Sequence, residues 1–311
     1  MTTVPTKTVV VTGGNTGLGF QCARFIGRDP DVLVVIACRN ADAGQQARTR
    51  LAAMGVHATA LTLDLASLAS VRAFVDRFRA EGLPPLVGLV CNAGLQNAGP
   101  AQRTVDGFES TFAVNHLGHF LLVNLLLPDM AAGSQITFVS SGVHDPEEKT
   151  GLPAPVFSST QAVANDVEER GLPAGQRRYT TSKLCNLYCT YELARRLQAS
   201  NDPRLRSICV NAFDPGMMPG TGLARNYPAP IRFAWNYVLP VLRLFKRNVH
   251  STVKSGQRLA ALSMPGANRP NGQYFSDGRE ARSSALSHDA GNARELWEAS
   301  AVYVGISGDI A

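Results

Sequence analysis

The chain has 311 residues, of which 45% are hydrophobic and 17% are charged. This length supports a large buried core and this composition is typical of a globular protein, so extensive disorder is excluded. The net charge is +6, from 30 lysines and arginines against 24 acidic residues. Because no basic run and no interleaved aromatic platform accompanies this charge, we expect no nucleic-acid partner. We interpret the excess as surface arginine together with a need to hold an anionic cofactor.

The cysteines lie mostly inside apolar runs and form no Cys-x-x-Cys pair, so no zinc, redox or other metal motif is expected. They are Cys22, Cys38, Cys91, Cys185, Cys189 and Cys209. Reduced thiols buried in a core fit a cytoplasmic protein. No basic segment followed by an apolar stretch opens the chain, which also favours a cytoplasmic location. Residues 110–128 could mimic a membrane span, but they contain Asn115, His116, His119 and Asn124, so we expect a buried helix instead.

Strand and helix patterns alternate along the first half of the chain. Strands are predicted at residues 8–12, 32–38, 57–63, 86–91, 135–140 and 207–213, with a short last strand at 273–275. Helices are predicted at residues 20–28, 42–54, 68–80, 105–127, 177–198, 249–262 and 292–300. The strands are apolar without strict alternation, as a parallel sheet covered on both faces requires. The sequence therefore predicts an α/β fold with a doubly wound parallel sheet, in a single domain over residues 1–311.

Two segments depart from this alternation. Residues 144–176 are polar and punctuated by proline and glycine, which indicates an insertion before a helix. Residues 217–248 are expected to form a substrate lid, and within them residues 229–247 have an apolar and an arginine-bearing face. The apolar face can bind an apolar substrate, touch a membrane surface, or pack on the core.

A glycine-rich turn follows the first predicted strand and opens the first helix. Such a turn brings the backbone close to a pyrophosphate, and the helix N-terminus supplies free N–H groups and a positive dipole end. The residues expected to bind the cofactor here are Gly13, Asn15, Thr16, Gly17, Leu18 and Gly19.

The second strand ends at Cys38-Arg39-Asn40, about 20 residues beyond the glycines. An NAD site usually offers a carboxylate here to the ribose 2′-hydroxyl, whereas this chain offers Arg39. A guanidinium pairs well with a 2′-phosphate, so the sequence favours NADP(H) over NAD(H).

A Tyr-x-x-x-Lys motif, Tyr179 and Lys183, lies on a predicted helix with both side chains on one face. A phenol with a pKa near ~10 transfers protons poorly at neutral pH, and a neighbouring ammonium favours its phenolate form. Ser140 and Ser141 end the fifth predicted strand, where a hydroxyl can bind a substrate oxygen. The sequence does not distinguish between these two serines.

Together these motifs resemble the short-chain dehydrogenase/reductase family over essentially the full chain. Residues 12–19 match TGxxxGxG, Asp64-Leu65 matches the adenine turn, Asn92-Ala93-Gly94 matches NAG, and Pro215-Gly216 matches the turn after the sixth strand. The resemblance implies a Rossmann fold, with Tyr179 as general acid or base and Lys183 holding the ribose hydroxyls. It also implies that Ser141 orients the carbonyl, and that Asn115 anchors a water in the proton relay.

Within the family, the chain looks most like retinol dehydrogenase-like and protochlorophyllide reductase-like members. This implies NADP(H) as cofactor and a bulky apolar ketone, aldehyde or alcohol as substrate. Two positions depart from the pattern. Met217 stands where protochlorophyllide enzymes usually carry a cysteine. Gly220 stands where many members have a threonine, so that Thr221, one residue later, becomes the candidate contact to the nicotinamide.

Three alternatives therefore stay open. The leading one is an NADP(H)-linked carbonyl reductase or alcohol dehydrogenase. Reduction of a C=C bond in a tetrapyrrole is the second, and Met217 counts against it. A non-catalytic NADP(H)-binding sensor is the third, and the complete set of catalytic residues counts against it. Many family members form homodimers through their long helices, although the insertion near Tyr179 could interfere.

Overall fold

Alternate residues of the first strand face two different cores. The computed structural model describes residues 4–97, 99–220, 227, 229–239, 249–266 and 270–310. Val9 and Val11 belong to one cluster of buried side chains, and Val10 belongs to the other. Because successive side chains of a strand point to opposite faces, the strand must be covered on both sides. This is why the sequence shows continuous apolar runs.

The sheet has the order β3-β2-β1-β4-β5-β6-β7-β8, and β1 to β7 are parallel. The strands are β1 (Lys7–Thr12), β2 (Val32–Cys38), β3 (Ala58–Thr62), β4 (Leu86–Cys91), β5 (Met130–Val139), β6 (Cys209–Asp214), β7 (Gln273–Ser276) and β8 (Arg279–Ala281). The order reverses between β1 and β4, which leaves a crevice at the carboxyl ends of the strands where such sheets bind ligands. The prediction of a doubly wound parallel sheet is confirmed.

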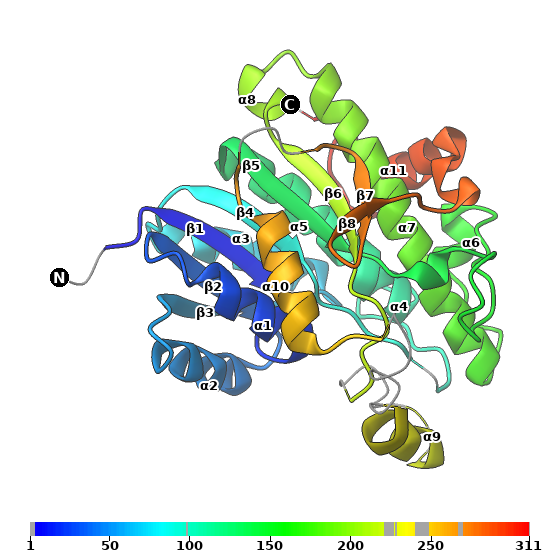
Figure 1. Ribbon diagram of the computed structural model, residues 1–311. Coiled ribbons are helices and arrows are strands. Elements are labelled where there is room, and N and C mark those ends of the chain that lie inside the picture. Colours follow the sequence, from blue (N-terminus) through cyan, green and yellow to red (C-terminus); the bar gives the residue numbers. More distant parts are fainter. Residues whose placement is uncertain are drawn as a thin grey trace.

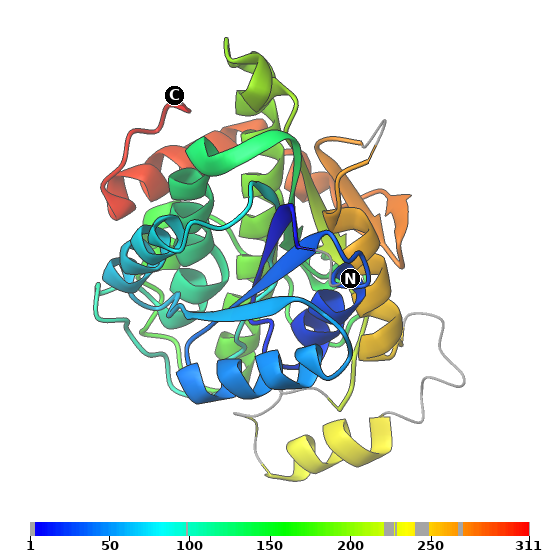
Figure 2. The same ribbon diagram turned by 90° about the vertical axis from the view of Figure 1, so that its left-hand side faces the viewer.

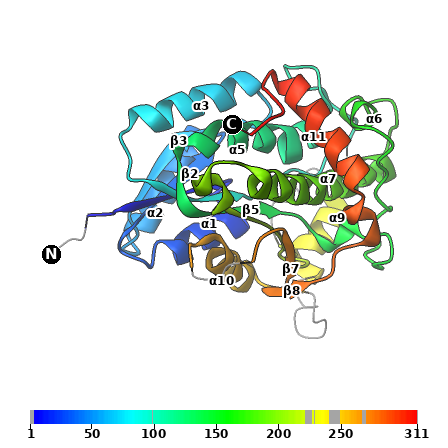
Figure 3. The same ribbon diagram turned by 90° about the horizontal axis from the view of Figure 1, so that it is seen from above.

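Helices cover both faces, as the views from the front and from above show (Figures 1 and 3). One face carries α1 (Gly17–Ile26), α2 (Ala41–Ala52) and α10 (Thr252–Ser263). The other carries α3 (Leu68–Ala80), α4 (Ser110–Phe112), α5 (Gly118–Leu126), α7 (Leu172–Ala199) and α11 (Ala290–Val304). Short helices α6 (Thr160–Ala164), α8 (Pro203–Arg206) and α9 (Ala229–Phe233) lie in the connections.

The predicted helix at 105–127 differs from the observed one. Helical structure begins at Ser110, and its second segment, Ala113–Leu117, is a π-helix around Asn115. Single π-turns inside α-helices occur frequently at functional sites. The stretch Ser110–Asp129 is long and apolar enough to cross a membrane, but 78% of its most apolar window is buried inside the protein. The expectation of a buried helix is met.

The strand β8 was not predicted. Asp277 and Gly278 both adopt positive φ, 53° and 74°, and reverse the chain from β7 into an antiparallel partner. Asp-Gly is the usual sequence of such a two-residue hairpin turn. The turn signal was therefore present, but a three-residue strand carries too little apolar pattern to be recognised.

Candidate active site

The glycine turn between β1 and α1 is closely packed on its inner side, where Gly19 leaves no space for a side chain. Gly13 and Gly17 have φ of 63° and 55°. A Cβ atom on Gly19 would lie 2.4 Å from the backbone oxygen of Gly13, whereas one on Gly17 would meet no atom within 4 Å. The backbone is thus packed on its inner side and open at Gly17, as a close approach to a ligand phosphate requires.

The N-terminus of α1 retains free donors. Thr16 occupies the N-cap, but its side chain makes no capping hydrogen bond, whereas Asn40 and Ser67 cap α2 and α3. The first N–H groups of α1 are therefore left for an anion. Asn15 and Leu18 lie in the same turn, half-buried and buried respectively.

Thr12 joins the glycine turn to the end of β4. Its hydroxyl accepts hydrogen bonds from the backbone N–H groups of Asn92 and Ala93, both at 2.9 Å, and its carbonyl accepts the Asn92 amide at 2.7 Å. Gly94 follows with an exposed backbone. These contacts bring the two predicted cofactor segments together at the crevice.

Arg39 and Asp64 follow the carboxyl ends of the neighbouring strands β2 and β3. β2 and β3 pair up to Cys38 and Thr62, and Arg39 follows as an exposed side chain. Asp64 is half-buried and accepts the N–H of Ala66, and Leu65 beside it is buried. The structure therefore places the predicted 2′-phosphate and adenine contacts side by side.

Tyr179 and Lys183 are neighbours on α7 and are both buried. The Lys183 ammonium lies 5.5 Å from the centre of the Tyr179 ring and donates to the Val139 carbonyl at 2.9 Å. A Cβ atom on Gly94 would lie 3.3 Å from the Asn115 side-chain oxygen and 3.8 Å from Lys183 Nζ. The helix bearing Asn115, the loop after β4 and α7 thus meet at one point.

The Asn115 side chain holds the loop after β4. It accepts the Leu95 N–H at 2.8 Å and donates to the Leu95 carbonyl at 2.9 Å. Its second N–H reaches Ser182 Oγ at 2.9 Å. Both amide hydrogens are therefore used in positioning, and the role of Asn115 in anchoring a water stays a prediction.

Burial is the largest influence on the pKa values of Tyr179 and Lys183. It lowers the pKa of Lys183 to about 8, with Asp214 acting in the opposite direction. Burial also raises the pKa of Tyr179, and the charges of Asp214 and Tyr227 raise it further. The sequence-based expectation was that the ammonium draws this phenol toward neutrality. The pKa of Tyr179 is instead raised, because desolvation of the phenolate is the larger effect.

The two serines at the end of β5 have different surroundings. Ser140 is buried and its hydroxyl donates to the Lys183 carbonyl at 2.8 Å. Ser141 is half-buried, and its carbonyl accepts the Nδ1–H of His144 at 2.7 Å. His144 Nε2 in turn accepts the Ser284 N–H at 3.1 Å. The structure thus uses the Ser140 hydroxyl for support and leaves Ser141 as the better candidate for substrate.

Asp214, which was not predicted from the sequence, stands directly before Pro215 and Gly216. Its buried carboxylate accepts hydrogen bonds from the Gly216 N–H at 2.9 Å and from the hydroxyls of Tyr274 and Ser276, each at 3.2 Å. An acidic residue directly before the Pro-Gly turn at a strand end was the available signal. Thr221 lies outside the described residues.

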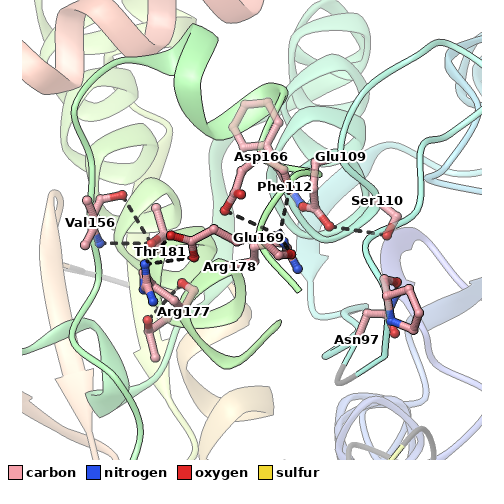
Figure 4. Close-up of polar contacts among 12 residues, drawn as sticks. Asn97, Glu109, Ser110, Phe112, Val156, Asp166, Glu169, Arg177, Arg178 and Thr181 are labelled. Atoms are coloured by element: carbon pink, nitrogen blue, oxygen red, sulfur yellow. Dashed lines mark hydrogen bonds and ion pairs between the residues drawn. The ribbon is translucent and has the colours of Figure 1, made fainter. Parts of the chain in front are cut away.

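The insertion is fastened to α7 (Figure 4). The buried guanidinium of Arg178 donates to the carbonyls of Asp166 and Glu169, and Thr181 exchanges hydrogen bonds with the backbone of Val156. The predicted boundary at 176 is wrong, because α7 begins at Leu172. The proline at the second helical position starts this helix instead of interrupting it.

Within the predicted lid, the helical segment at residues 229–239, which includes α9, stands apart from the sheet (Figure 2). Helix α9 and the π-turn Ala234–Val238 contain no buried residue. Phe233 and Tyr237 are 60% and 70% exposed. The interpretation that this apolar face packs on the core is therefore wrong for residues 229–239; the rest of the predicted lid lies largely outside the described residues.

Three curated relatives match nearly the whole chain. A polyprenol dehydrogenase from Danio rerio is 34% identical, over 96% of this chain and 87% of the relative. Retinol dehydrogenase 12 from Mus musculus is 34% identical, over 97% and 88%. Protochlorophyllide reductase A from Oryza sativa subsp. japonica is 32% identical, over 96% and 80%. The predicted likeness to retinol dehydrogenase-like and protochlorophyllide reductase-like enzymes is confirmed.

Solved structures agree on the fold. A protein of unassigned function from Mycobacterium paratuberculosis superposes with a TM-score of 0.71 at 28% identity, over 99% of this chain and 96% of that one. A short-chain dehydrogenase from Burkholderia cenocepacia in complex with NADP has a TM-score of 0.61 at 24% identity, over 88% and 96%. The family model for short chain dehydrogenase matches residues 7–152. Together with the relatives, this shows that the chain belongs to the short-chain dehydrogenase family of oxidoreductases.

Proposed function

We propose that this chain is an NADP(H)-dependent oxidoreductase that moves a hydride between the nicotinamide and a ketone, aldehyde or alcohol on an apolar skeleton. The observation that carries the proposal is the buried pair of Tyr179 and Lys183, which meets Asn115 and Gly94 at the crevice. A phenol beside an ammonium at a ligand crevice suits proton transfer to a carbonyl oxygen.

The crevice fits a dinucleotide phosphate. The start of α1 has no side-chain cap, and Gly19 packs closely against the Gly13 backbone while the turn stays open at Gly17, which suits a pyrophosphate at this helix N-terminus. Exposed Arg39 would hold a 2′-phosphate. The NADP complex among the structural neighbours supports this choice of cofactor.

NADPH, when bound, supplies the hydride for reduction of the carbonyl carbon. The Tyr179 hydroxyl would then donate its proton to the carbonyl oxygen. Burial keeps this phenol protonated at neutral pH, which suits it to act as the acid in reduction. The Lys183 ammonium would stabilise the phenolate that remains, and Ser141 would donate a hydrogen bond to the same oxygen.

An apolar substrate is supported by two observations. The apolar side chains of α9 are exposed, and one relative is a polyprenol dehydrogenase. The similarity to the protochlorophyllide reductase from rice keeps reduction of a C=C bond in a tetrapyrrole as the second candidate function. Illuminated and dark assays with protochlorophyllide test it. Met217, whose backbone bridges to Val249, still counts against that alternative.

The test is oxidation of NADPH, and of NADH, against a panel of apolar ketones and aldehydes. Tyr179→Phe should lower kcat by roughly 10²–10⁴, which is the usual contribution of a proton donor, while NADPH binding measured by fluorescence is retained. Tyr191→Phe is the matched control. It removes a phenol hydroxyl from the same helix, but this hydroxyl hydrogen-bonds with Ser283. NADPH binding by the wild-type protein without turnover on the whole panel would instead indicate a sensor.

A further inference from the structure

The side chain of His144 bonds to backbone groups through both of its ring nitrogens. The residue is only 1% exposed and ends the short 3₁₀ turn Gly142–His144 that follows Ser141. Its Nδ1–H donates to the Ser141 carbonyl at 2.7 Å, and its Nε2 accepts the Ser284 N–H at 3.1 Å. Burial lowers the pKa of His144, so the ring is neutral at physiological pH and each nitrogen has one fixed role. The ring therefore ties the turn after β5 to the segment after β8.

The Ser141 carbonyl receives both donors of His144. The backbone N–H of His144 reaches this carbonyl at 3.1 Å, in addition to the ring N–H. By contrast, no hydrogen bond within the described part of the chain engages the Ser141 hydroxyl. The backbone of Ser141 is thus held while its hydroxyl stays available, and a side chain that orients a substrate needs this kind of support from the residues behind it.

Tyr274 and Asp214 support the same turn from β7 and β6. The Tyr274 ring meets the His144 ring edge-on, with 5.2 Å between the ring centres, and the Tyr274 hydroxyl donates to Asp214 at 3.2 Å. The Asp214 carboxylate also accepts the Gly216 N–H at 2.9 Å, and a Cβ atom on Gly142 would lie 3.4 Å from it. The turn after β5 and the turn after β6 therefore both pack against one buried carboxylate, which limits the movement of either turn.

We propose that His144 is a positioning residue for the reaction: by holding the Ser141 backbone through its Nδ1–H, it directs the Ser141 hydroxyl at the substrate oxygen. This inference rests on the proposed function, which gives that hydroxyl a reacting carbonyl to orient. The hydrogen bond from Ser141 strengthens as negative charge develops on the substrate oxygen, so a misplaced serine lowers kcat more than it raises KM. Because His144 acts through Ser141, its effect on kcat must vanish when the Ser141 hydroxyl is removed.

Two substitutions separate the two hydrogen bonds of the ring. In His144→Asn the amide N–H can replace Nδ1–H at the Ser141 carbonyl, but the side chain is too short to reach Ser284. In His144→Gln the amide oxygen can replace Nε2 as the acceptor for Ser284, but the Ser141 carbonyl loses its side-chain donor. Both variants should lose similar thermal stability, because each lacks one buried hydrogen bond.

The kinetic test uses NADPH and the panel of apolar ketones and aldehydes. His144→Gln should lower kcat by roughly tenfold with little change in KM, whereas His144→Asn should stay within about threefold of the wild-type kcat. In the Ser141→Ala background, the change of His144 to Gln should alter kcat by less than about twofold. A merely structural role would instead lower kcat in both variants and in both backgrounds.

Amide hydrogen exchange, measured by mass spectrometry, reports on the turn after Ser141 without any turnover. A peptide that covers residues 140–146 should exchange faster in His144→Gln than in the wild type and in His144→Asn. The inference is overturned if the two variants lower kcat equally, if the loss in His144→Gln persists in the Ser141→Ala background, or if this peptide exchanges equally in all three proteins. Absence of wild-type turnover on the whole panel contradicts the proposed function, and the exchange comparison then decides by itself whether His144 holds the Ser141 turn.

Discussion

The Nε2 atom of His119 lies 2.9 Å from the hydroxyl of Thr12, and the opposite ring nitrogen lies 3.2 Å from the Asn115 carbonyl. Burial lowers the pKa of His119 to about 4, so the ring is neutral at physiological pH. Nδ1–H then donates to Asn115 and Nε2 accepts from Thr12, which leaves the threonine oxygen to accept from Asn92 and Ala93. One neutral histidine thereby connects the glycine turn to the helix that carries Asn115.

We expect this connection to make the protein sensitive to acid. Because the folded pKa of His119 is below the unfolded value of 6.5, the unfolded state binds more protons between pH 6.5 and about 4. The free energy of unfolding should therefore decrease as the pH is lowered from 6.5 to about 4, by on the order of 3 kcal/mol for this residue. Urea unfolding at several pH values measures the slope of the unfolding free energy against pH. His119→Gln should reduce this slope by the equivalent of about one bound proton. An equal reduction in His57→Gln, a partly exposed histidine, would contradict the assignment.

Lys183 should give the activity a high-pH limit. Burial lowers its pKa to about 8, so above that pH the ammonium that supports Tyr179 loses its proton. We expect kcat/KM for carbonyl reduction to decline above about pH 8. Lys183→Arg keeps a charge at all working pH values, so its profile should lack this decline even where the overall rate is lower. The same decline in both proteins would assign it to another group.

Arg39 should decide between the two nicotinamide cofactors. Arg39→Leu removes the exposed guanidinium at the end of β2 and, with it, charge-assisted hydrogen bonds of about 1.5–3 kcal/mol. The Kd for NADPH should rise roughly 10- to 100-fold, while the Kd for NADH stays nearly constant. Arg48→Leu, an exposed arginine on α2, is the control. Parallel weakening of both cofactors in Arg39→Leu would argue against a 2′-phosphate contact.

Arg178 should hold the insertion against α7. Its guanidinium is buried and pairs with Asp166, so Arg178→Met leaves polar groups of the insertion without their donor. We expect a loss of about 3–5 kcal/mol in the free energy of unfolding and faster tryptic cleavage within residues 145–170. Arg177→Met breaks a more exposed pair with Glu169 and should cost less than about 1 kcal/mol. Similar losses in the two variants would show that burial of Arg178 is unimportant.

The exposed face of α9 leads us to propose membrane contact for this segment. With a net charge of +6 and with Phe233 and Tyr237 largely exposed, the protein should sediment with vesicles that contain anionic lipid. Phe233→Ser and Tyr237→Ser together should weaken this binding several-fold. Val302→Ser removes an equally exposed apolar side chain from α11 and should have no effect. Binding that is unaffected by all three substitutions would exclude α9 as the contact.

Most of the sheet was predictable because its strands are local runs with clear ends. The predictions at residues 32–38, 86–91 and 68–80 coincide with β2, β4 and α3. The start of α7 was missed, because Gly171 and Pro173 signal both an interruption and a helix start. The pairing of the Ser140 hydroxyl with the Lys183 carbonyl, and the hydrogen bond from Gln176 to Tyr227, were not predictable. Both depend on side-chain packing between segments far apart in the sequence, which periodicity does not encode.

Helix α11 has a consequence for self-association. It packs along α7 and touches α5, as the view from above shows (Figure 3). Residues 178–194 of α7 are all buried, and so are residues 118–123 of α5. Helix α11 therefore covers a side of α5 and α7 that a second subunit could otherwise contact. We therefore propose that any homodimer of this protein is built from a surface other than these two helices.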